Sequence, residues 1–78
     1  MQKIRPDLDL GMNIKLMRVA RSMTQEQVIA QMQLRGLDIS RGVYSKIENN
    51  RMNIKVSELV ALKAIFGRSS FDDFFKDL

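Results

Sequence analysis

Apolar side chains recur at intervals of three and four residues along most of this chain, which is the spacing that lines one face of an α-helix. Leu10, Ile14 and Met17 form one such stripe. β-Branched runs with the period of two typical of strands are missing. The only proline is Pro6, so no proline interrupts a helix from residue 7 onward. The pattern therefore predicts an all-α fold.

Caps and turn residues divide this pattern into five helices. The predicted segments are 10–22, 25–34, 41–49, 56–66 and a short last one that is capped by Ser69 or Ser70 and holds Phe71, Phe74 and Phe75. Thr24 followed by Gln27 is a capping-box pattern, and Ser40 is the expected N-cap of the third helix. Gly36 suits a left-handed C-cap, and residues 49–51 close the third helix because Asn tolerates that conformation. Five helices with short connections indicate an α-helical bundle.

Size and composition fit one small domain and exclude most enzyme chemistry. The chain has 78 residues, and we expect a single domain over residues 1–78. It has no cysteine and no histidine, which excludes disulfides, thiolate metal sites, the commonest general base and the commonest metal ligand. Asp72, Asp73 and Asp77 stand at a predicted helix start without further ligands. We expect no enzyme activity, no metal and no cofactor.

The chain lacks the patterns of a membrane or secreted protein. No apolar run approaches the roughly 18–20 residues that span a bilayer. Residues 1–10 carry Asp7 and Asp9 and have no apolar core of a secretory signal. We therefore expect a cytoplasmic protein without a membrane partner.

The charge distribution predicts one basic face. The net charge of +4 and the isoelectric point near 9.9 favour a polyanionic partner. Arg41, Lys46, Arg51 and Lys55 cluster in one central stretch, whereas the last ten residues lean acidic. By itself, this cluster is also typical of a solvated helix face with no partner.

The predicted helix 41–49 has two different faces. Tyr44 and Ile47, three residues apart, face inward. The outward positions hold small or cationic side chains, which are Arg41, Gly42, Ser45 and Lys46. A helix that enters the major groove, about 12 Å wide, needs short side chains for close approach and long donors that reach bases or phosphates. This helix meets both needs.

At this point the sequence resembles the Cro/C1-type helix-turn-helix proteins, also called the Xre family. The resemblance is carried by Met23-Thr24-Gln25-Glu26-Gln27, Ile39-Ser40-Arg41, Ser45-Lys46-Ile47-Glu48-Asn49, Glu58-Leu59 with Leu62, and Ser70-Phe71-Asp72-Asp73-Phe74-Phe75. Each motif is short, but their order and spacing over residues 10–75 are specific. The resemblance implies the five-helix bundle of the lambda-repressor-like DNA-binding type, with helices 25–34 and 41–49 as the DNA-binding pair.

The resemblance also implies which residues act. It places base-edge contacts at Arg41, Gly42, Val43 and Lys46, phosphate contacts at Gln25, Asn49 and Arg51, and adds Ser40 and Ser45 to the DNA-binding set. Free N–H groups at the starts of the two helices suit phosphates as well. Arg18 and Glu48 are expected to meet inside the bundle as a structural ion pair.

Three features depart from the family pattern. The turn over residues 32–40 is several residues longer than usual, so either the second helix is extended or a true loop follows it. Gly42 stands where a base-reading side chain is common. Ile29 replaces the usual small alanine of the second helix.

These observations favour a sequence-specific transcriptional regulator, a repressor, that binds double-stranded DNA. The alternative is a protein-interaction module on the same fold, such as an antitoxin or a regulator held by a protein antagonist, because fold alone does not fix function. Whether a second copy of the chain is also a partner, in a homodimer, is left open by the sequence. Met12, Leu16 and Val19 give the first helix a second apolar face. Either the last segment or the turn near Leu37 covers this face within one chain, or a second copy does.

Overall fold

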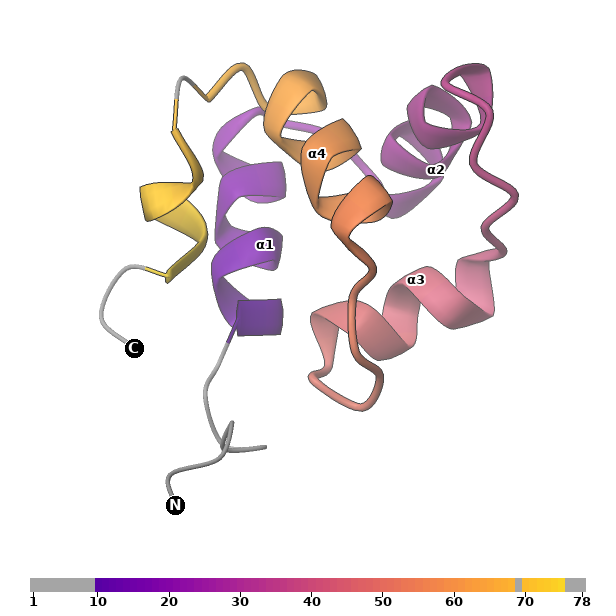
Figure 1. Ribbon diagram of the computed structural model, residues 1–78, viewed down its shortest axis with the longest axis horizontal. Helices are drawn as coiled ribbons and strands as arrows, with labels where there is room; N and C mark the ends of the chain where they lie inside the picture. The colour runs from indigo at the N-terminus through magenta and orange to yellow at the C-terminus, as the bar shows by residue number, and fades with distance from the viewer. Residues whose placement is uncertain (1–9, 69, 76–78) are drawn as a thin grey trace.

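The computed structural model describes residues 10–68 and 70–75, and this part of the chain is helical without strands. Its elements are α1 (Leu10–Ala20), α2 (Gln25–Leu34), α3 (Arg41–Glu48), α4 (Val56–Ile65) and η1 (Phe71–Phe75), as Figure 1 shows. The all-α prediction is therefore confirmed. No helix in these residues is long and apolar enough to cross a membrane.

The fifth predicted helix differs from the expectation. The structure has four α-helices in its described residues, and the last segment is a 3-10 helix. It spans only Phe71–Phe75, and so short a segment is typical of 3-10 geometry. Ser70 accepts a hydrogen bond from the Asp72 amide at 3.0 Å and so caps it. The alternative cap Ser69, like Asp77, lies outside the described residues.

The helices pack in a fixed order around one core. Helix α1 contacts α3 and η1, while α2 contacts α3 and α4. Figure 1 shows η1 against α1 at one end of the molecule and the pair α2–α3 at the other. The α2–α3 pair is thus held by α1 and α4 from behind.

The core is built from the apolar stripes of every element. Its buried side chains are Ile14, Met17, Val28, Ile29, Met32, Ile39, Tyr44, Ile47, Ala61, Leu62, Ile65, Phe66 and Phe74. Burying such side chains is the main source of stability in a chain without disulfides. Tyr44 is fully buried, as its spacing with Ile47 predicted.

The two predicted N-caps begin α2 and α3. Thr24 Oγ1 accepts from the Gln27 amide at 3.1 Å, and the Thr24 amide donates to Gln27 Oε1 at 2.8 Å. This reciprocal pair completes the predicted capping box. Ser40 Oγ accepts from the Val43 amide at 3.2 Å. The caps fix where both helices of the pair start.

The second residue after each of these α-helices has a positive φ. These residues are Ser22, Gly36, Asn50 and Gly67. After α2, the Gly36 amide donates to the Gln33 carbonyl at 3.0 Å and the Leu37 amide to the Met32 carbonyl at 3.1 Å. These two bonds form a Schellman motif, which stops the helix.

The long turn between α2 and α3 is therefore a loop and not an extension of α2. Ile39 anchors it, because its side chain is buried in the core. Gln33 Nε2 also donates to the Ile39 carbonyl oxygen at 3.2 Å. The loop brings the chain back so that α3 starts at Arg41.

Candidate nucleic-acid interface

Helix α3 turns one face to the core and the other to solvent. Tyr44 and Ile47 are buried. The exposed positions of the helix and its C-cap are Arg41, Gly42, Lys46 and Asn49, and Ser45 is half-buried beside them. With 3.6 residues per turn, Gly42, Lys46 and Asn49 lie along one side. The outward face therefore carries the small and cationic residues that the sequence placed there.

Gly42 leaves a gap in this face. A Cβ atom at Gly42 would have only Ser40 Oγ nearby, at 3.9 Å, so the fold has room for a side chain there. Glycine in a helix costs about 0.5–1 kcal/mol relative to alanine. Packing within the described residues thus gives no reason for a glycine at this position.

The remaining predicted contacts flank this face. Val43 is half-buried and packs against the core, so only part of it faces outward. Asn49 Nδ2 donates to Ser45 Oγ at 3.5 Å. Arg51 is exposed in the turn after α3, where its amide donates to the Lys46 carbonyl at 2.8 Å. Asn49 and Arg51 lie at the C-terminal end of α3, while Ser40 lies at its start as the N-cap.

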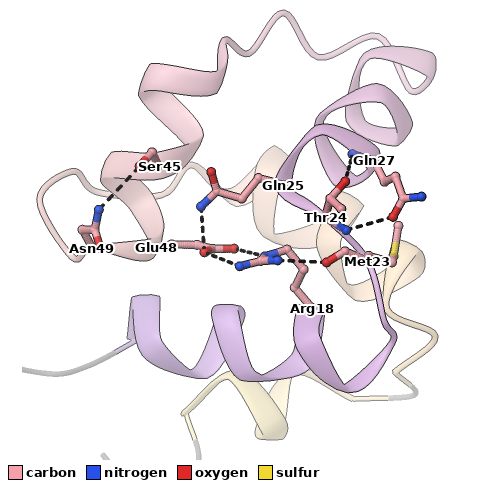
Figure 2. A network of polar contacts seen from close by, with 8 residues as sticks. All are labelled: Arg18, Met23, Thr24, Gln25, Gln27, Ser45, Glu48 and Asn49. Atoms are coloured by element: carbon pink, nitrogen blue, oxygen red, sulfur yellow. Dashed lines mark hydrogen bonds and ion pairs between the residues drawn. The ribbon is translucent and has the colours of Figure 1, made fainter.

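A buried polar network lies behind α3 (Figure 2). Arg18 Nε is 2.7 Å from Glu48 Oε2, and Arg18 Nη2 donates to Glu48 Oε1 at 3.2 Å. Arg18 Nη1 also donates to the Met23 carbonyl at 2.8 Å. The two residues implied as an ion pair therefore form a two-bond contact that joins α1 to α3.

The same carboxylate holds Gln25 at the start of α2. Gln25 Nε2 donates to Glu48 Oε1 at 3.0 Å (Figure 2). An amide nitrogen carries two hydrogens, so one remains for another acceptor. Gln25 is half-buried, so the residue stays partly accessible to solvent while Glu48 holds its side chain.

The network shifts the titration of its members. Burial acts to raise the pKa of Glu48, but the hydrogen bonds from Arg18 and Gln25, together with the nearby Tyr44 hydroxyl, outweigh it, so this pKa lies below its ordinary value. The hydrogen bond to Glu48 raises the pKa of Arg18. Burial, and then the Glu48 carboxylate, raises the pKa of Tyr44. The Tyr44 hydroxyl faces this carboxylate without a hydrogen bond of good geometry.

Two structural features of the site escaped the sequence analysis. A Cβ atom at Gly11 would clash with the Ile47 carbonyl oxygen, so α1 and α3 approach each other closely there. Glu26, in the first turn of α2, pairs with Arg41 at 3.0 Å. Glu26 directly follows Gln25, a predicted DNA-binding residue, and this position next to the site was the only sequence signal for its role.

The comparisons with known proteins identify the chain at the family level. A family model described as Helix-turn-helix matches residues 14–74, which is most of the chain. No curated protein and no solved structure matches. Among the described residues, no group of three acidic, cysteine or histidine side chains is placed to hold a metal ion. With the helical fold and the α2–α3 pair, this match shows that the protein belongs to the Cro/C1-type, or Xre, helix-turn-helix family of DNA-binding transcription regulators.

Proposed function

We propose that this protein is a sequence-specific repressor that inserts α3 into the major groove of double-stranded DNA. The observation that carries the proposal is the two-faced α3. Its core side is fixed by Tyr44 and Ile47, and its exposed side offers Arg41, Gly42 and Lys46. A helix held in this way presents short and cationic groups to base edges.

Each residue of the exposed face has a chemical role in this proposal. Arg41 and Lys46 donate hydrogen bonds to base acceptors such as O6 and N7 of guanine. Gly42 permits the helix backbone to come close to the bases. Gln25, held by Glu48, donates its second amide hydrogen to a phosphate, and Asn49 does so at the other end of α3. Phosphate contacts set the position and base contacts set the sequence preference.

In this proposal, the protein represses transcription by occupying the DNA of a promoter. A domain that binds tightly over a promoter excludes other proteins from the same DNA. We assign the protein to this simple steric mode. The proposed place of action is the cytoplasm.

The test is selection of bound duplexes from a random pool, repeated at low and moderate salt. We expect one enriched sequence, and a log–log decrease of affinity with salt that reflects counterion release from the contacted phosphates. Failure to enrich any sequence at both salt concentrations would refute sequence-specific binding.

A second candidate function, contact with another protein, rests on the exposed apolar stripe of α1. Met12, Leu16 and Val19 are 42%, 57% and 55% exposed. The sequence left open that the last segment or the turn near Leu37 covers this stripe, but in the described residues neither buries it. We infer that a second copy of the chain does, since a two-fold dimer matches paired DNA half-sites. A toxin or an antagonist protein on the same stripe is the competing outcome.

A further inference from the structure

A carboxylate stands next to the first base-reading residue of the proposed interface. Glu26 Oε2 lies 3.0 Å from Arg41 Nη1, and the two side chains are 59% and 69% exposed. Glu26 belongs to the first turn of α2 and Arg41 is the first residue of α3. The pair therefore bridges the starts of the two helices that face DNA in the proposed function.

This pair has little to do with stability. Ion pairs between solvent-exposed side chains contribute about 0–1 kcal/mol, because water screens the charges and both side chains lose freedom. The Glu26 carboxylate has a larger effect on the affinity for DNA than on stability. A carboxylate at a DNA surface repels phosphates, which lowers affinity for every duplex regardless of sequence.

The geometry also restricts what Arg41 can do. The guanidinium has five N–H donors in a fixed plane. The ion pair with Glu26 joins Nη1, which keeps the guanidinium beside the start of α2 and leaves Nε and Nη2 for other acceptors. A two-bond contact to guanine needs such an oriented plane, whereas a phosphate contact is satisfied by any nearby cation.

We propose that Glu26 is a specificity-determining positioning residue. It orients Arg41 for base contact and penalises the use of Arg41 as a general phosphate contact. The inference rests on the proposed DNA-binding function and deepens it, because it assigns to α2 a share in sequence discrimination.

A simpler role for Glu26 predicts a different result. An acidic residue in the first turn of a helix is stabilised by the helix dipole. In that case Glu26→Gln would lower the stability slightly and would change affinity for all duplexes by one common factor. The ratio of affinities for two duplexes separates the two roles.

The experiment measures that ratio with the full chain. The affinities of the wild type and of Glu26→Gln are determined for the selected duplex and for a scrambled duplex of the same length. We expect Glu26→Gln to bind the scrambled duplex more tightly and to lose about tenfold in the ratio, which is within the discrimination of one two-bond base contact. In an Arg41→Ala background, the same substitution should leave the ratio unchanged.

Asp73→Asn is the matched control. Asp73, in η1, pairs with Arg68 at 3.3 Å, so this variant also removes one negative charge and one Arg–carboxylate pair. It should leave the ratio unchanged. If Glu26→Gln alters the ratio no more than Asp73→Asn, or alters it equally without Arg41, the positioning role is wrong although DNA binding stands. A wild type that selects no sequence would instead refute the proposed function, and this inference with it.

Discussion

Arg18 Nε lies 2.7 Å from Glu48 Oε2, although the two residues are 30 positions apart in the sequence. The two side chains are only 12% and 2% exposed. The contact ties the last turn of α1 to the last residue of α3, directly behind the proposed DNA-binding face. Because both groups are largely out of water, the loss of one partner leaves a charge without compensation.

Arg18→Met should therefore destabilise the protein strongly. We expect a loss of about 3 kcal/mol in the free energy of unfolding at neutral pH, because Glu48 would remain buried and unpaired. Chemical denaturation measures this loss. The double variant Arg18→Met with Glu48→Leu should recover much of it, since it removes both charges. A double variant that is less stable than Arg18→Met would contradict this account.

Tyr44 should couple stability to alkaline pH. Burial and the Glu48 carboxylate raise the pKa of this phenol above its ordinary value of 10.0. The folded protein therefore retains a proton that the unfolded chain releases, so the stabilisation is complete below about pH 10 and is lost as the pH rises further. Comparison of the wild type with Tyr44→Phe between about pH 8 and pH 11 isolates this group from the lysines.

The chain contains a single tyrosine, which makes the titration specific. Phenolate absorbance should appear only together with the loss of helical circular dichroism. Ionisation at an ordinary midpoint in a chain that is still helical would show that Tyr44 is not shielded.

Gly11 and Gly42 should respond in opposite ways to alanine. Gly11→Ala forces a Cβ atom against the Ile47 carbonyl oxygen in the backbone of α3 and should cost about 1–3 kcal/mol of stability. Gly42→Ala meets only Ser40 Oγ, at an ordinary contact distance of 3.9 Å, and should raise stability by up to about 1 kcal/mol. Thermal unfolding of both variants checks this. Weaker DNA binding by a more stable Gly42→Ala would support close approach at this position.

Local features of this fold could be predicted from the sequence because they depend on neighbouring residues. Thr24 with Gln27, and Ser40, begin α2 and α3 where the patterns placed them. The order of the helices and of the turn between them could also be recognised, because it rests on short local motifs. The boundary between α2 and the long turn remained open, because Gly36 fits both a helix end and a loop.

Non-local contacts were the part that could not be predicted from these patterns. The approach of Gly11 to Ile47 joins segments far apart in the chain, and an ordinary glycine in a helical pattern does not indicate it. The pairing of Glu26 with Arg41 depends on how the loop returns the chain to α2. Arg18 with Glu48 was expected only through the family resemblance, since no spacing rule connects them.

Removal of the cationic groups of α3 tests the DNA contacts. Arg41→Ala and Lys46→Ala should each weaken binding to the selected duplex by about 1–3 kcal/mol and relax the preference at one base position. Gln25→Ala should weaken binding to all duplexes more evenly, because it contacts phosphate. Affinities for selected and scrambled duplexes distinguish these patterns. An unchanged affinity of the double variant Arg41→Ala with Lys46→Ala would show that α3 does not read DNA.

The apolar stripe of α1 leads to the last prediction, which concerns assembly. Leu16 and Val19 are more than half exposed, so glutamate at these positions removes little internal packing. The double variant Leu16→Glu with Val19→Glu should therefore keep the thermal stability of the monomer, sediment as a monomer where the wild type dimerises, and lose affinity for a palindrome but not for a single half-site. Val60→Glu, a similarly exposed position on α4, is the control and should leave assembly unchanged. A wild type that stays monomeric at high micromolar concentration would exclude this stripe as a dimer contact, and retained palindrome affinity in the double variant would do the same.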